Sequence, residues 1–240
     1  LHAYLPLVTA DMPGREKLMH LKGNRAYSFC NYCLCRGIHD GRAIYCPFTP
    51  PEDPPAGIVD DTEKARKAGY PWPSHNRWQL PLRSNDDFRQ NAGYIASDPG
   101  HNAAQRKTGI GGQSILHHLS SIDFPRSFPP DAMHLFYENI VPNMVRHYRG
   151  VFFKPALDTS NDSWNVQPAH WTQIGQYQQT SRDTLPASFG RAPRNFASHC
   201  HEFSGEEWKQ QAHLFLPIYL QDILPNDHYE QFCALTQAMN

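Results

Sequence analysis

The chain has 240 residues, of which 40% are hydrophobic and 19% charged, and its formal net charge is -1. This near-neutral charge argues against a broad phosphate-binding surface, because proteins that neutralise many phosphates usually carry a visible basic excess. The sequence contains no run of the roughly 18 apolar residues that a membrane span needs, and no signal peptide is visible at its start. We therefore expect a soluble, intracellular protein with no membrane contact.

The first predicted element is a strand. The apolar run from Leu5 to Ala10 has the composition of a buried strand, and it ends at Asp11. Pro13 and Gly14 follow as breakers. Residues 15–21 are compatible with a short helix.

The middle of the chain is rich in breakers. Residues 47–55 form a proline-rich linker that cannot be a regular element, and residues 61–70 predict a short exposed helix. Residues 71–113 are polar and rich in glycine, asparagine and proline, so we expect loops there with at most one helix, at about 86–96.

Helical spacing of apolar residues dominates the rest of the chain. We expect helical segments at 114–122, 132–148 and 168–178, a helix that begins at Ser204, and a last helix at about 227–239. Two prolines, Pro142 and Pro217, fall inside these runs; Pro142 predicts a kink, and Pro217 predicts a kinked helix or two shorter ones.

The stretch CNYCLC places three of the six cysteines between residues 30 and 35. Cys30 and Cys33 have the spacing with which two thiolates bind one zinc ion, although a single pair of this kind is a weak signal. On spacing alone, a metal site and a bland buried pair are about equally supported, while a disulfide fits the intracellular composition poorly. Cys35 looks less committed to a site. A zinc site needs two further ligands, for which the candidates are His39, Cys46, His134, His147, His199, Cys200 and His201.

The acidic candidates also have structural interpretations. An aspartate that closes a strand before a proline, as Asp11 does, is most often a turn former. Glu206 and Glu207 would lie in the first turn of their helix, where acids stabilise the helix dipole. From the residues alone, both interpretations stay open.

Four strings resemble the transposases of CACTA-type elements in the form common in fungal genomes, and the resemblance covers nearly the whole chain. They are TADMPGREKLMHLKGNRAYSFCNYCLCRG, GIGGQSILHHLSSIDFPRSFPPDAMHLFYENIVPNMVRHYRG, WTQIGQYQQTSRDTLPASFGRAPRNF and GEEW. The resemblance implies an α/β fold: a partial RNase H-like core, with a mixed sheet flanked by helices, and a helix- and loop-rich zinc-containing insertion, helix-dominated overall.

The resemblance also implies catalytic residues. DDE-type transposases cut and join DNA with three acids that hold two Mg²⁺ ions, which stabilise the attacking and leaving oxygens of the displacement. Asp11 matches the second acid, Glu206 or Glu207 the third, and Glu138 is a further candidate for the third. The first acid would lie upstream of Leu1, so we expect the isolated chain to be inactive.

A structural Zn²⁺ site is implied in the same way. Cys30 and Cys33 match a cysteine pair that, in a similar recombinase subunit, is joined through zinc to histidines far downstream. By that analogy His134 is the best partner ligand. His147 is the first choice for the fourth ligand and His201 the second.

The expected organisation has four parts. Residues 1–46 belong to the catalytic core, 47–113 form a loop-rich insertion, 114–150 a helical segment with the DAMH motif, and 151–240 a helical part that carries the third acid. The expected function is that of a nuclear transposase fragment that cleaves and transfers DNA strands, with DNA as partner and homo-oligomerisation left open. The alternative is a non-catalytic, zinc-stabilised interaction module derived from a transposase.

Overall fold

The computed structural model describes the chain except for residues 1–3, 40–43, 46–78, 99, 153–161 and 240. The expected linker at 47–55 and the expected helix at 61–70 lie outside the described residues. The chain forms two compact units, Leu1–Asp131 and Ala132–Asn240, and each is described here by itself. The expected segments 1–46 and 47–113 both fall in the first unit, and the segment 114–150 spans the boundary.

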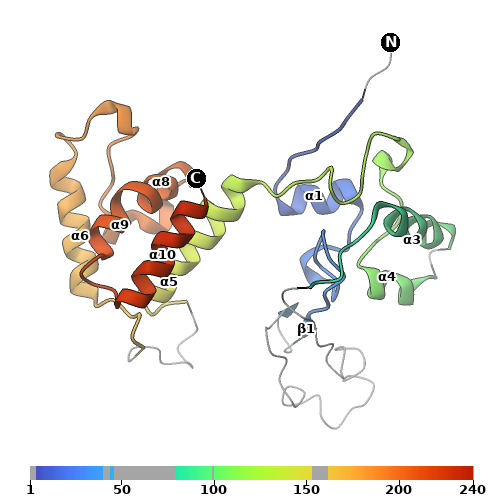
Figure 1. Cartoon of the computed structure of the whole chain (residues 1–240), viewed down its shortest axis with the longest axis horizontal. Helices are drawn as coiled ribbons and strands as arrows, with labels where there is room; N and C mark the ends of the chain where they lie inside the picture. The colour runs from blue at the N-terminus through green and yellow to red at the C-terminus, as the bar shows by residue number, and fades with distance from the viewer. Residues whose placement is uncertain (1–3, 40–43, 46–78, 99, 153–161, 240) are drawn as a thin grey trace, which may run out of the picture. The chain divides into compact units, whose positions relative to one another are not determined.

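The first unit is built mainly from short helices (Figure 1). Its small core contains three phenylalanine rings. Its elements are α1 (Met12–Met19), η1 (Gly23–Arg25), β1 (Ile38–His39), β2 (Ile44–Tyr45), α3 (Asn85–Ser97), α4 (Asn102–Thr108) and η2 (Ile115–His118). Phe124 lies at the centre of the core, stacked on Phe88 at 4.6 Å and on Phe128 at 5.3 Å between ring centroids. The fully buried Met19 brings α1 into the same cluster.

The prediction of an α/β fold with an RNase H-like mixed sheet is wrong for the part of the chain that the structure describes. In this part of the chain, the strands β1 and β2 form one antiparallel ladder of two residues each, in which Ile38 faces Tyr45 and His39 faces Ile44. The remaining elements are helices.

The run from Leu5 to Ala10 explains the error. It is extended but forms no strand, and the side chain of Leu7 is 60% exposed. One backbone-to-backbone hydrogen bond, from Val8 N–H to the carbonyl of Ser127, and the hydrogen bonds of the Leu5 backbone with the Ser121 hydroxyl fix it to the rest of the unit. Apolar composition favours a strand only where a neighbouring strand supplies a hydrogen-bonding ladder, and no described segment supplies one for this run.

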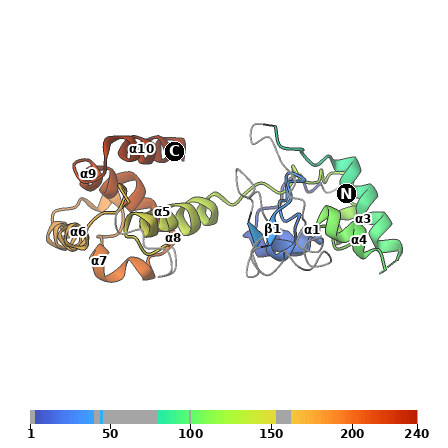
Figure 2. The same ribbon diagram turned by 90° about the horizontal axis from the view of Figure 1, so that it is seen from below.

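The regular elements among the described residues of the second unit are all helices (Figure 2). Its elements are η3 (Met133–Ile140), α5 (Val141–Tyr148), α6 (Pro168–Ser181), η4 (Ala187–Phe189), α7 (Phe196–His199), η5 (Cys200–Glu202), α8 (Gly205–Gln210), η6 (Gln211–Phe215), α9 (Leu216–Leu220) and α10 (Asn226–Ala238). Its core brings together Trp171, Phe196, Trp208 and Phe232, among others. None of the described helices of either unit is long and apolar enough to cross a membrane.

The two prolines inside this unit have a specific effect on the helices. The segments η3 and η6 are π-helices, and each runs directly into an α-helix that carries proline in its first turn, Pro142 in α5 and Pro217 in α9. Proline lacks an N–H and its ring clashes with the carbonyl four residues earlier. A π-turn widens the helix locally, so the helix continues past the proline.

Candidate metal centre

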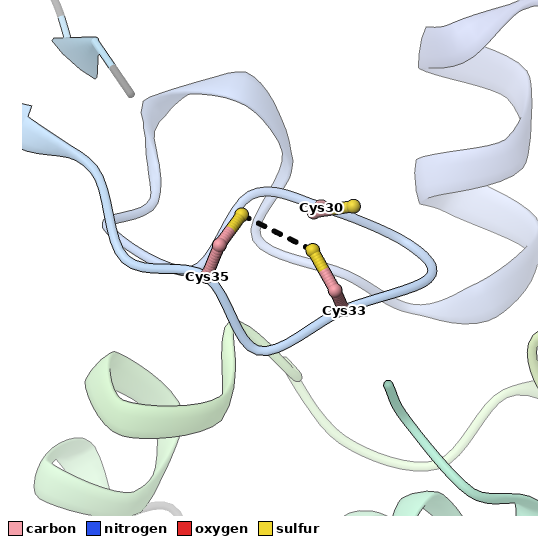
Figure 3. A group of neighbouring side chains, drawn as sticks. All are labelled: Cys30, Cys33 and Cys35. Atoms are coloured by element: carbon pink, nitrogen blue, oxygen red, sulfur yellow. Dashed lines mark hydrogen bonds between the residues drawn. The ribbon is translucent and has the colours of Figure 1, made fainter. Parts of the chain in front are cut away.

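Three cysteine side chains converge inside one loop of the first unit. The Sγ atoms of Cys30, Cys33 and Cys35 all lie within 4.8 Å of one another, and Figure 3 shows them gathered by the tight turn of this loop. Cys33 and Cys35 are 4% and 5% exposed, and the Cys33 thiol donates to Cys35 Sγ at 3.2 Å. None of the three forms a disulfide.

The spacing of the sulfurs fits a metal ion better than a disulfide. Bonds of about 2.3 Å from Zn²⁺ to three thiolates in tetrahedral geometry place the sulfurs roughly 3.8 Å apart. A disulfide requires about 2.05 Å. The observed separations, 3.2 Å for one pair and at most 4.8 Å for the others, need shifts of about 1 Å or less to surround zinc. The three cysteines could therefore hold a metal such as zinc.

The loop also favours a thiolate at its first cysteine. Hydrogen bonding with the thiols of Cys33 and Cys35 and with the backbone N–H groups of Tyr32 and Cys33 lowers the pKa of Cys30, although burial acts in the opposite direction. The interaction with Cys30 raises the pKa of Cys33. Metal ligation requires the deprotonated thiolate, and the N–H donors of the loop are placed to stabilise it.

Two remote segments hold the loop in shape. The hydroxyl of Tyr32 accepts a hydrogen bond from Arg15 of α1 at 3.0 Å and donates to the carbonyl of Phe128 at 2.5 Å. On the other side, Leu34 N–H donates to the carbonyl of Pro81 at 2.8 Å, and Cys33 pairs with Leu82 in an isolated antiparallel bridge. The cysteines are thus fixed by contacts on both sides of their turn.

A buried arginine lies against the cysteine loop. Arg83 is 7% exposed, and its guanidinium donates to the carbonyls of Cys30 at 3.0 Å and Ser28 at 3.4 Å. Burial lowers its pKa, while the sulfurs of Cys30, Cys33 and Cys35 act in the opposite direction by attracting the charge. A buried cation is costly unless an anion compensates it, and the cysteine cluster is the anionic group that acts on this one.

The ligands that the sequence predicts are only partly brought together. Cys30 and Cys33 meet as expected, but their described partner is Cys35, which spacing alone left aside. His134 and His147 belong to the second unit, where His134 lies 3.4 Å from Glu138 and His147 stacks on Phe152. Their predicted role as zinc ligands stays a prediction.

The remaining candidate ligands add nothing to the described cluster. Cys46 and the side chain of His39 lie outside the described residues. In the second unit, His199 and His201 each lie beside Glu202, at 3.7 and 3.4 Å, and Cys200 accepts a hydrogen bond from Arg149.

The acids assigned to catalysis occupy structural positions. Asp11 caps α1 by accepting from Gly14 N–H at 2.7 Å. Glu207 forms a capping box with Ser204 at the start of α8 and a two-bonded ion pair with Arg194, at 2.7 and 3.0 Å. Burial raises the pKa of Glu207, but the hydrogen bonds from Arg194 and Ser204 outweigh burial and leave it below the ordinary value.

Glu206 is exposed on the same turn of α8 as Glu207, and Glu138 pairs with His134 on η3. Asp11 belongs to the first unit and these glutamates to the second. Their convergence on a common Mg²⁺ site therefore stays a prediction. Among the described residues, the cysteine cluster is the one group of three or more potential ligands that lie close enough to share a metal ion.

Sequence reasoning missed Cys35 and Arg83. Cys35 carried a local signal, because it lies two residues after Cys33 and extends the motif to three thiols in six residues. Arg83 carried no local signal, since it lies 53 residues from Cys30.

Comparison of the chain with protein-family models, with curated proteins and with solved structures gave no match.

Proposed function

We propose that the first unit is a zinc-stabilised, non-catalytic interaction module, derived from a transposase as the sequence resemblance suggests. The observation that carries the proposal is the convergence of three sulfurs within 4.8 Å in a loop braced on both sides. Structural zinc sites contribute folding energy directly. A metal would be valuable in this unit because its described core is a small cluster centred on a few aromatic rings.

The surroundings of the cysteines accommodate a metal-bound state. Three thiolates and one divalent ion would leave one net negative charge, which compensates the buried guanidinium of Arg83 as the Cys30 thiolate does without a metal.

The loop also presents apolar side chains outward. Leu82 is 74% exposed and Leu34 40% exposed, whereas their chain neighbours Arg83 and Cys33 are buried against the site. This alternation leaves two leucines on the outer side of the segments that hold the sulfurs. Contact with a partner at this position would depend on the metal that orders the loop. The DNA partner implied by the resemblance is part of the same proposal.

Two of the four candidate acids, Asp11 and Glu207, favour the non-catalytic alternative over a transposase fragment that cleaves DNA. Two-metal catalysis needs carboxylates free to bind hard cations. The Asp11 carboxylate caps a helix, and both oxygens of Glu207 accept hydrogen bonds from Arg194 or Ser204. Strand cleavage by this chain is therefore the less supported hypothesis.

Two measurements on the full 240-residue chain test the proposal. A chelator of high zinc affinity should release zinc and lower the melting temperature of the first unit, and Cys30→Ser should have the same effect. Supercoiled plasmid incubated with the protein and Mg²⁺ should stay intact. Mg²⁺-dependent nicking that Asp11→Ala abolishes would establish the catalytic alternative. A chain that melts identically with and without chelator would exclude the zinc-stabilised module.

DNA binding is tested separately with a mobility-shift assay on the zinc-loaded and the chelated chain. The proposal predicts a shift that requires zinc and that Leu82→Ser weakens. A shift of equal strength in the chelated protein would show that the cysteine loop does not form the interaction surface.

A further inference from the structure

A cavity of about 560 Å³ opens in the second unit. Its lining residues are distant in sequence from the cysteine cluster of the first unit. Its walls come from the end of η3, from α5 and the residue Val151 beyond it, and from the segment that links η5 to α8. This volume lies within the range of pockets that bind small molecules, about 300–1,000 Å³. All its lining residues belong to the second unit, so the cavity is defined within one compact body.

Two arginines form one wall. Arg146 and Arg149 lie about one helical turn apart at the C-terminal end of α5, and both line the cavity. Among the described residues, no carboxylate lies within ion-pair distance of either guanidinium. The C-terminal end of a helix favours cations, which accounts for their position on α5. It does not account for the cavity in front of them.

The hydrogen bonding of Arg149 leaves it available to an anion. Its Nη1 donates to Cys200 Sγ at 2.8 Å, and sulfur is a weak acceptor. Burial raises the pKa of the Cys200 thiol, although Arg149 acts in the opposite direction, so the thiol does not neutralise the guanidinium near neutral pH. The one acid in the wall, Glu138, already lies 3.4 Å from His134. The cavity therefore has a net positive side.

Other residues that line the cavity are aromatic or apolar. Trp208 and Phe203 line the cavity together with Val145, and their rings pack edge to face with centroids 5.5 Å apart. Trp208 is 7% exposed and is held from behind by Phe196 at 5.9 Å. An aromatic wall fixed in this way suits a flat ring. Paired guanidinium groups suit a phosphate, because their planar forks match its oxygens.

We propose that this cavity binds a small phosphomonoester that carries a flat heterocyclic ring, of the nucleoside monophosphate class, with the phosphate on Arg146 and Arg149 and the ring against Trp208 and Phe203. The combination of an arginine pair that has no carboxylate partner among the described residues with aromatic lining residues in one cavity carries the inference. Neither feature requires the metal site of the first unit, so the failure of one proposal leaves the other standing.

The test is isothermal titration calorimetry of the full chain with adenosine 5′-monophosphate, with adenosine and inorganic phosphate as separate probes. We expect saturable binding of the monophosphate with a Kd below about 1 mM and at least tenfold tighter than either probe. Arg146→Gln and Arg149→Gln should each weaken it at least tenfold, while Arg149→Lys, which keeps the charge, should weaken it less. Arg182→Gln, which alters an exposed arginine at the end of α6, is the matched control and should change nothing.

Each alternative outcome overturns the proposal. Absence of saturable binding by the unaltered chain excludes the site. Equal binding of adenosine shows that phosphate is not recognised, and equal binding of inorganic phosphate shows that the ring is not. Binding unaffected by both arginine-to-glutamine substitutions places the ligand elsewhere. Melting temperatures confirm folding, and the exposed Arg146 keeps the test valid if a change at half-buried Arg149 disturbs the fold.

Discussion

Replacement of Glu207 by alanine separates a structural role for this acid from a catalytic one. Its Oε2 accepts from the backbone N–H and the hydroxyl of Ser204, at 2.9 and 3.2 Å, and also from Arg194 at 3.0 Å, while its Oε1 accepts from Arg194 at 2.7 Å. Loss of a capping interaction and of its charge-assisted hydrogen bond costs about 2 kcal/mol of unfolding free energy. Loss of the ion pair with Arg194 adds to this cost.

For a unit of about 100 residues, this loss lowers the melting temperature by roughly 10 °C. The matched control is Glu206→Ala on the same turn of α8, where the side chain is exposed and a change within about 0.5 kcal/mol is expected. Differential scanning calorimetry of both variants measures the contrast. Equal melting temperatures for Glu206→Ala and Glu207→Ala would refute the structural role, and the refutation would be complete if Glu207→Ala alone abolished a measured DNA cleavage.

Three further predictions follow from the same contacts. The folded-state pKa of Glu207 lies below its ordinary value of 4.5, so calorimetry should show that its stabilisation relative to Glu207→Gln is full above pH 4.5 and disappears as the pH falls through the folded-state pKa. Asp11→Ala should lower the unfolding free energy of the first unit by about 1 kcal/mol in denaturant titrations. Asp11→Asn, whose side-chain oxygen can still cap the helix, should keep most of this stability. Equal losses in the two variants would contradict the capping role of Asp11. Arg83→Met should weaken zinc binding at least tenfold in competition with a chelator, and Arg83→Lys less, whereas unchanged affinity would remove the guanidinium from the account.

The helices of the second unit were predictable because their signals are local. Ser204 precedes two glutamates and forms the capping box that this pattern indicates. The expected helices at 168–178 and 227–239 correspond to α6 (Pro168–Ser181) and α10 (Asn226–Ala238). Pro142 was predicted to kink its helix, and Pro217 to kink its helix or divide it into two; the structure places a π-helix before each proline, and the kinks stay a prediction. The spacing of apolar residues carries no signal for such a π-helix.

Whether a mixed sheet forms could not be judged from one segment of sequence with strand composition. The run from Leu5 to Ala10 has strand composition, but a strand exists only with a partner strand. The described surroundings offer this run a single backbone-to-backbone hydrogen bond, from Val8, and otherwise the hydroxyl of Ser121. The candidate site shows the same division. Cys30 and Cys33 were predictable from their spacing, and Cys35 was within reach of the same motif. Arg83 reaches the cysteines through the tertiary structure, so no local pattern could predict it.

Zinc-edge X-ray absorption of the purified 240-residue chain tests the central claim most directly. The account predicts one zinc per chain with at least three sulfur neighbours at about 2.3 Å, and one sulfur fewer in the Cys35→Ser variant. A chain that carries no zinc, or a zinc with two or fewer sulfur neighbours, would contradict a metal centre formed by Cys30, Cys33 and Cys35.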